Sequence, residues 1–105
     1  MNIFQQTNRP AETASLTTMI KEGALLLDVR TPGEFELGHV NGSVNIPLDR
    51  LGLSLAGLNK MKNIIVYCQS GGRSSMAKSI LEQNGFTRVI NGGTWIYVNQ
   101  LLNAI

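Results

Sequence analysis

The residues best suited to chemistry lie together in one segment, residues 68–74, which reads CQSGGRS. Cys68 is the only cysteine of the chain, and a cysteine thiolate is a strong nucleophile. Gly71 and Gly72 permit the positive φ angles that a tight loop needs. Arg73 adds a fixed positive charge and several N–H donors. This composition is typical of a loop that holds an anion close to a reactive sulfur.

The position of this segment between two predicted elements supports that interpretation. An apolar run that predicts a strand ends just before Cys68, and an amphipathic segment that predicts a helix begins at Ser74. Backbone N–H groups in a strand-to-helix loop, together with the helix dipole, favour a bound anion. We therefore expect the pKa of Cys68 to lie below that of an ordinary thiol. We predict Cys68 as the catalytic residue, with the substrate-binding residues Gln69, Ser70, Gly71, Gly72 and Arg73.

Other interpretations of the segment are less favoured. A lone cysteine in a small domain is more often a buried, unreactive side chain, and paired glycines are more often a turn; the flanking strand and helix and the nearby Arg73 weigh against this. Cysteine-based phosphatases and arsenate reductases place five residues between cysteine and arginine, whereas four separate Cys68 from Arg73. The shorter loop makes a smaller cradle, suited to sulfur, so phosphatase or arsenate reductase chemistry is the weaker alternative.

The rest of the chain predicts alternating strands and helices that position this loop. Strands are expected over 24–29, 43–46, 63–67 and 88–90, and helices over 15–22, 48–58, 74–84 and from residue 94 onward, with a turn at 91–93. Thr31 and Glu34 match a capping box that opens a further short helix. The alternation predicts an α/β fold with a mostly parallel sheet. Because ligands bind at the carboxyl ends of such strands, Cys68 lies at the expected edge.

Length and charge limit the function further. The 105 residues suit a single domain over 1–105, in which residues 1–14 form a weakly patterned and loosely ordered start. Nine Lys and Arg against seven Asp and Glu give no basic patch for nucleic acid.

The short apolar runs predict no membrane span. The start lacks a secretion signal, so a reducing cytoplasm is expected. One histidine and one cysteine make a metal site unexpected.

Several fragments in order resemble the single-domain rhodanese-like sulfurtransferases, over about residues 15 to 97. These fragments are LLLDVR at 25–30, EF at 34–35, GHV at 38–40, GS at 42–43, NIP at 45–47, the Cys68 loop, and NGG at 91–93 before Trp95. The resemblance implies a sheet of about five parallel strands flanked by helices, with the catalytic loop at Cys68. Gln69 departs from the basic residue that many active relatives have at its position, which puts a preference for thiosulfate in question.

The resemblance also implies a mechanism and partners. The Cys68 thiolate attacks the sulfane sulfur of a small anionic donor such as thiosulfate, holds it as a persulfide, and passes it to cyanide, a thiol or a protein acceptor. No cofactor is implied. The alternative is a sulfur carrier or regulatory interaction module that is loaded by a protein partner.

Other polar residues are expected to support the site. Asp28 and Arg30, at the end of a strand, are predicted to form an ion pair that fixes the neighbouring loop, and Ser74 is a further supporting residue. His39 lies in a Gly-His turn, and the resemblance implies a structural role for it, so we do not expect it to be a catalytic base. Trp95 is expected to be a packed anchor.

Overall fold

A computed structural model describes residues 10–105, and the side chains from residue 13 onward. Its centre is a parallel sheet of four strands in the order β2-β1-β3-β4. These strands are β1 (Leu25–Asp28), β2 (Val44–Asn45), β3 (Ile64–Cys68) and β4 (Val89–Thr94). The predicted α/β class is confirmed. The number of about five strands, implied by the resemblance, is wrong for residues 10–105, where the sheet has the four strands that the apolar pattern predicted.

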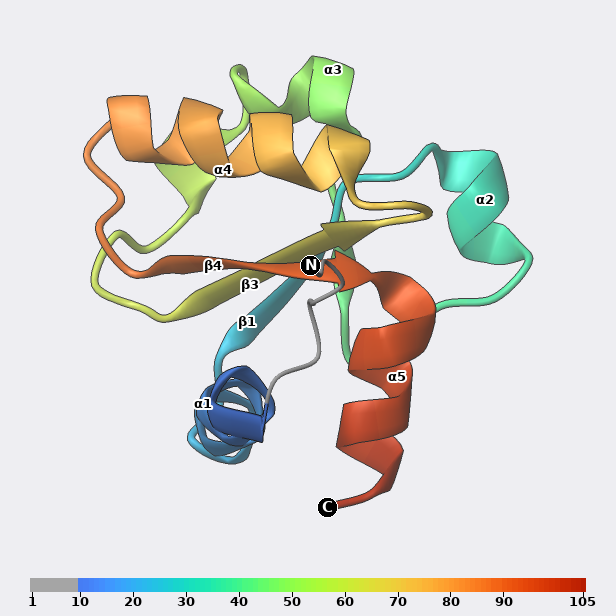
Figure 1. The fold of residues 1–105 in the computed structure, drawn as a ribbon. Coiled ribbons are helices and arrows are strands. Elements are labelled where there is room, and N and C mark those ends of the chain that lie inside the picture. The colour runs from blue at the N-terminus through green and yellow to red at the C-terminus, as the bar shows by residue number, and fades with distance from the viewer. Residues whose placement is uncertain (1–9) are drawn as a thin grey trace, which may run out of the picture.

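Helices cover both faces of the sheet (Figure 1). One face carries α3 (Leu48–Leu51), a short 3-10 helix (Leu55–Gly57) and α4 (Gly72–Gln83). The other face carries α1 (Pro10–Lys21) and α5 (Trp95–Asn103). The short helix α2 (Pro32–Glu36) follows β1 and lies beyond the edge at which the strands end. Within residues 10–105, no helix is both long and apolar enough to cross a membrane.

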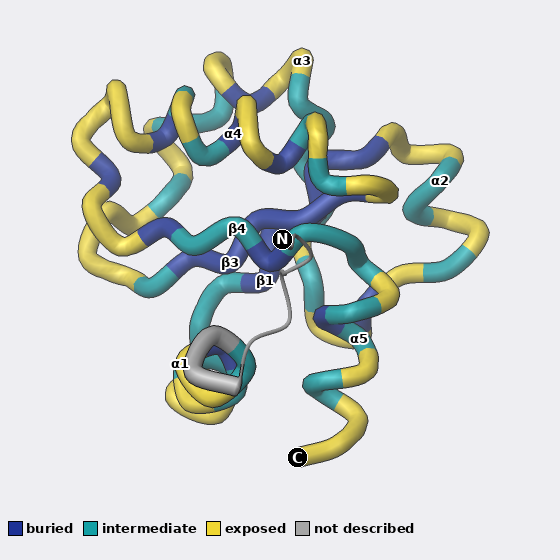
Figure 2. Tube along the Cα trace, viewed as in Figure 1, coloured by how far each residue is buried: buried dark blue, intermediate teal, exposed yellow. Residues whose placement is uncertain are grey.

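The central strand β3 is buried along its whole length, as Figure 2 shows. Its side chains alternate between the two faces, as a strand requires. Ile64, Val66 and Cys68 belong to the core beneath α4. Ile65 and Tyr67 belong to the core that includes residues of α1 and α5. Cys68 therefore faces the start of the helix that follows it.

The structure differs from the sequence prediction around β4. Residues 91–93, expected as a turn, belong to β4, and Cys68, expected just beyond β3, is its last residue and pairs with Thr94. The register of the pairing between β3 and β4 shifts between Val66 and Tyr67. A Cβ atom on Gly92 would stand 2.8 Å from Val98 and 2.9 Å from Ile65, so only glycine fits beneath α5.

Two helices also differ from their predictions. The segment 48–58, expected as one helix, divides into α3 and the 3-10 helix, with Gly52 at the C-terminus of α3. The first helix begins at Pro10, ahead of the predicted start, so residues 10–14 are helical. The part of the predicted loose N-terminal segment that covers residues 1–9 lies outside the described residues.

Candidate active site

Cys68 ends β3 at the carboxyl edge of the sheet, and its side chain is fully buried. The next residues turn away as a short loop before α4 begins at Gly72. Gly71, the residue that precedes the helix, has a φ of +100°, a conformation that side chains other than glycine rarely adopt. That conformation lets the chain bend back over the sulfur.

The hydrogen bonds of the sulfur include one with the Gly71 backbone and one with the Ser74 side chain. The backbone N–H of Gly71 donates to Cys68 Sγ at 3.0 Å. The Cys68 thiol in turn donates to Ser74 Oγ at 3.5 Å. The Ser74 hydroxyl has its own acceptors, the carbonyl oxygens of Gly71 at 3.0 Å and Gly93 at 3.4 Å. When the thiol ionises, this hydroxyl can turn its single proton to the thiolate.

The balance of these interactions favours the thiolate. Burial raises the pKa of the Cys68 thiol, because a charge is costly away from water. Hydrogen bonds from the Ser74 hydroxyl and from the backbone N–H groups of Ser74, Gly71 and Ser70 lower it more. The net result is a pKa below the ordinary value, which agrees with the prediction from the loop sequence.

The remaining loop residues contribute mainly through the backbone. Gln69 and Ser70 are exposed, as is Gly72 at the start of α4. The backbone N–H groups of Ser70, Gly71 and Ser74 form hydrogen bonds with Cys68 Sγ. The positive end of α4, a helix of 12 residues, begins in the same loop. This arrangement suits a sulfur atom that carries negative charge.

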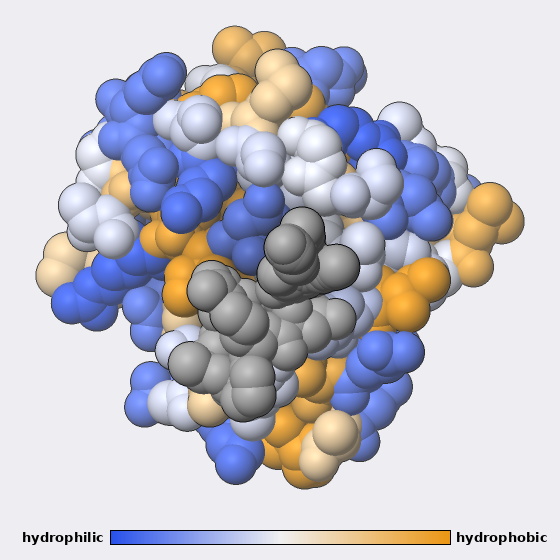
Figure 3. Space-filling view, viewed as in Figure 1, coloured by the Kyte–Doolittle hydropathy of each residue, from blue (hydrophilic) through white to orange (hydrophobic). Residues whose placement is uncertain are grey.

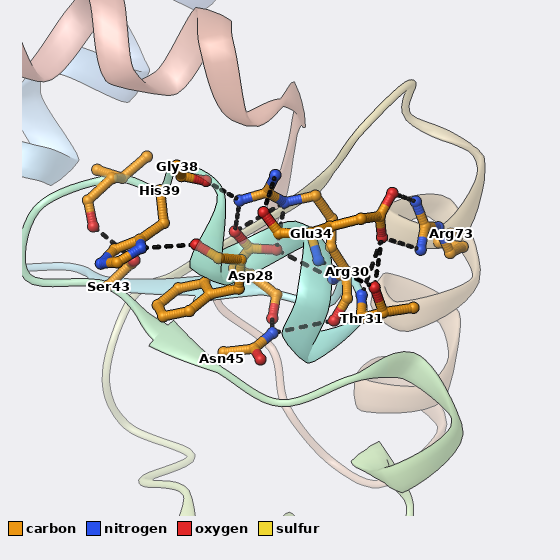
Figure 4. Close-up of polar contacts among 11 residues, drawn as sticks. Asp28, Arg30, Thr31, Glu34, Gly38, His39, Ser43, Asn45 and Arg73 are labelled. Carbon is orange, nitrogen blue, oxygen red and sulfur yellow. Dashed lines mark hydrogen bonds and ion pairs between the residues drawn. The ribbon is translucent and has the colours of Figure 1, made fainter.

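The Arg73 side chain is held by an acidic residue of another helix. Its guanidinium forms a two-pronged ion pair with Glu34 of α2, with Nη1 to Oε1 at 2.7 Å and Nη2 to Oε2 at 3.0 Å (Figure 4). Glu34 also forms the predicted capping box, since its carboxylate accepts from the Thr31 N–H at 3.0 Å. The hydrogen bonds from Arg73 and Thr31 lower the pKa of Glu34 from 4.5 to about 2. The capping role was predicted, but the pairing with Arg73 was not.

Asp28 and Arg30 form the predicted ion pair, and both are buried. Arg30 Nη2 lies 2.7 Å from Asp28 Oδ2, and Arg30 Nε donates to the same carboxylate at 3.0 Å. Arg30 also donates to the carbonyl oxygens of Gly38 at 2.8 Å and Glu34 at 3.3 Å. Its guanidinium lies 4.7 Å from the ring centroid of Trp95. Arg30 therefore ties β1 to α2 and to the start of α5.

Two polar residues near this edge were not assigned roles from the sequence. The Asn45 side-chain amide donates to the carbonyl oxygens of Asp28 and Arg30, each at 3.0 Å, and so fixes the turn after β1 (Figure 4). Thr94, paired with Cys68, accepts from the Tyr97 N–H at 3.2 Å and begins α5. A polar residue inside a short apolar strand was the available signal for Asn45.

His39 has structural contacts. Its ring stacks on Phe35 with centroids 3.8 Å apart, and its Nδ1 lies 2.8 Å from the Phe35 carbonyl oxygen. These contacts join α2 to the turn that follows it. They give His39 a local packing role, in agreement with the sequence prediction.

The Rhodanese-like domain model matches residues 12–94. The chain belongs to the rhodanese-like family. It is 32% identical over 81 residues to a sulfurtransferase of Allochromatium vinosum, covering 77% of this chain and 76% of that one. It is 41% identical over 69 residues to a thiosulfate sulfurtransferase of Escherichia coli strain K12, covering 64% and 66%.

Solved structures of this rhodanese-like family have the same fold. A rhodanese-related protein of Thermoplasma volcanium superposes with a TM-score of 0.71 at 30% identity, covering 88% of each chain. A rhodanese from E. coli solved with anions superposes with a TM-score of 0.65 at 35% identity, covering 71% of this chain and 91% of that one. The parallel sheet with helices on both faces is therefore the arrangement of this family.

Proposed function

We propose that this rhodanese-like domain is a sulfurtransferase with Cys68 as its nucleophile. The observation that carries the proposal is the hydrogen bond of 3.0 Å from the Gly71 N–H to Cys68 Sγ, in a loop that lowers the pKa of the thiol. A thiolate held in this way needs no separate general base. The family of the chain and the names of its relatives support a transferase activity.

The proposed reaction has two steps. The Cys68 thiolate attacks the outer sulfur of thiosulfate, the new S–S bond forms, and the old bond breaks with its electron pair leaving on sulfite. The resulting Cys68 persulfide gives its outer sulfur to cyanide or to a thiolate, and the electron pair of the broken bond returns to Cys68. The N–H groups of Gly71, Ser70 and Ser74 stabilise the sulfur anion in both steps.

Mass spectrometry tests the first step directly. After incubation with thiosulfate, the intact protein should gain the mass of one sulfur atom, and cyanide should remove it. Cys68→Ser should gain nothing, whereas Ser75→Ala, a change at an exposed neighbour of Ser74, should load normally. Failure of the wild-type chain to load from thiosulfate and from an organic persulfide would overturn the proposal.

A carrier of sulfur between proteins is the second candidate. A putative sulfur carrier protein of Bacillus subtilis is 40% identical over 70 residues, covering 67% of this chain and 38% of that one. A carrier loads one sulfur from a persulfidated protein but shows negligible steady-state release of thiocyanate from thiosulfate and cyanide.

A further inference from the structure

The positive charge nearest the Cys68 loop is neutralised by a neighbouring helix. Arg73 of α4 faces Glu34 of α2 with both nitrogens of its guanidinium fork, at 2.7 and 3.0 Å (Figure 4). Two-pronged pairs of this kind fix direction as well as distance. The side chains of the pair are 35% and 33% exposed. The surface over the start of α4 is largely hydrophilic, and that over the α2 region is mixed (Figure 3).

Glu34 is held in place by contacts that do not involve Arg73. Its Oε1 accepts from the Thr31 N–H at 3.0 Å and from the Thr31 hydroxyl at 3.2 Å. The Thr31 hydroxyl in turn accepts from the Glu34 N–H at 3.2 Å. Helix α2 therefore presents the carboxylate at a fixed position, and Arg73 turns toward it.

The second arginine of this network is also paired. Arg30 is buried against Asp28, with Nη2 and Oδ2 2.7 Å apart. The four side chains of the two pairs sum to zero charge, and Gln69 adds none. The positive potential at the loop then comes from backbone N–H groups and the helix dipole alone, and it is weaker than it would be beside an unpaired Arg73.

We propose that Glu34 sets the donor preference of the site: by holding Arg73, it disfavours a dianionic sulfur donor relative to a monoanionic one. The inference rests on the proposed sulfurtransferase function and concerns the class of donor. Glu34 acts as a positioning residue, because it contacts Arg73 and not the reacting sulfur. Releasing Arg73 adds one positive charge beside the loop, which attracts a dianion more than a monoanion.

Two donors of nearly the same shape differ in this charge. Thiosulfate carries two negative charges, and the methanethiosulfonate anion, in which a methyl group replaces one oxygen, carries one. Both give their outer sulfur to the Cys68 thiolate to form the same persulfide. Thiosulfate releases sulfite, the methanethiosulfonate anion releases methanesulfinate, and in each case the leaving group takes the electron pair of the broken S–S bond.

The test compares the second-order rate constants for loading Cys68 from each donor, read by mass spectrometry. Glu34→Gln preserves the capping geometry, since glutamine also serves at this position, but removes the charge. We expect the thiosulfate-to-methanethiosulfonate ratio to rise by about tenfold in Glu34→Gln. The control Glu36→Gln makes the same charge change at an exposed position of the same helix and should leave the ratio within about twofold. Arg73→Gln, which leaves Glu34 unpaired, should lower the ratio.

The possible outcomes separate the two proposals. If neither donor loads the wild-type chain, the sulfurtransferase function and the donor preference both fall. If both donors load Cys68 but Glu34→Gln changes the two rates by the same factor, the pair only shapes the loop and the donor preference alone is overturned. An equal rise of the ratio in Glu36→Gln would also overturn it, because any added charge would then serve.

Discussion

Ser74 is the side chain that accommodates both protonation states of Cys68. Its oxygen accepts from the thiol at 3.5 Å, and its proton has the carbonyl oxygens of Gly71 and Gly93 as acceptors while the thiol is neutral. A hydroxyl serves both roles because it has one donor and two lone pairs. The sequence marked Ser74 only as supporting, since the loop geometry that brings Oγ to Sγ was not visible from spacing.

Ser74→Ala should therefore raise the pKa of Cys68, because the hydroxyl is among the groups that lower it. At neutral pH the rate of alkylation by iodoacetamide should fall by about tenfold or more, because a hydrogen bond to a charged group contributes about 1.5–3 kcal/mol. The thiolate absorbance in the ultraviolet, titrated against pH and corrected with Cys68→Ser, measures the shift. Ser75→Ala is the matched control, and identical titrations of the two alanine variants would contradict this role for Ser74.

At the scale of elements, α2 shows how a short helix depends on one acidic residue. Glu34 completes the capping box with Thr31 and also pairs with Arg73 at the start of α4. The helix has five residues and none of them is fully buried, so these two links help to fix its position. The capping box follows from sequence spacing, whereas the partner on α4 depends on how two distant segments pack.

The pH dependence of stability should report these links. The pKa of Glu34 falls from 4.5 to about 2 on folding, so its stabilising effect is full above pH 4.5 and is lost as the pH falls toward 2. The wild-type melting temperature should accordingly fall more steeply over this range than that of Glu34→Gln. Thermal unfolding followed by circular dichroism at a series of pH values measures the difference. Glu36→Gln should keep the wild-type slope, and parallel curves for wild type and Glu34→Gln would refute the assignment.

At the scale of the whole molecule, the parallel sheet brings the polar residues to one edge. β1 ends at Asp28 and β3 ends at Cys68, and they are neighbouring strands that point the same way. Arg30 then connects β1 with the α2 segment and with Trp95 of α5. The buried pair of Asp28 and Arg30 thus joins segments that are far apart in the sequence.

Arg30→Met should be strongly destabilising, because it leaves the Asp28 carboxylate buried without its partner. We expect a loss of about 3–5 kcal/mol in the free energy of unfolding. Urea denaturation gives this value, and Arg50→Met, at an exposed position, is the control that removes an arginine without breaking a buried pair. A loss below about 1 kcal/mol would mean that Arg30 is dispensable to the fold.

Much of the architecture could be predicted from local patterns. Continuous apolar runs indicated β1 and β3, and the Thr31 capping box indicated α2. The errors fell where packing overrides local preference. Residues 91–93 look like a turn but pair with β3, because that pairing satisfies backbone groups and Gly92 lets α5 approach closely.

The sequence alone predicted Cys68 as the nucleophile of the proposed reaction and indicated the kind of loop that holds it. Cys68 is the only cysteine, and its setting between a strand and a helix follows from apolar periodicity and glycine placement, which are local properties of the chain. Only the tertiary structure decided which charges the loop presents. Arg73 is paired with Glu34, 39 positions away in the sequence, and a contact over that separation depends on how α2 and α4 pack at one edge of the sheet.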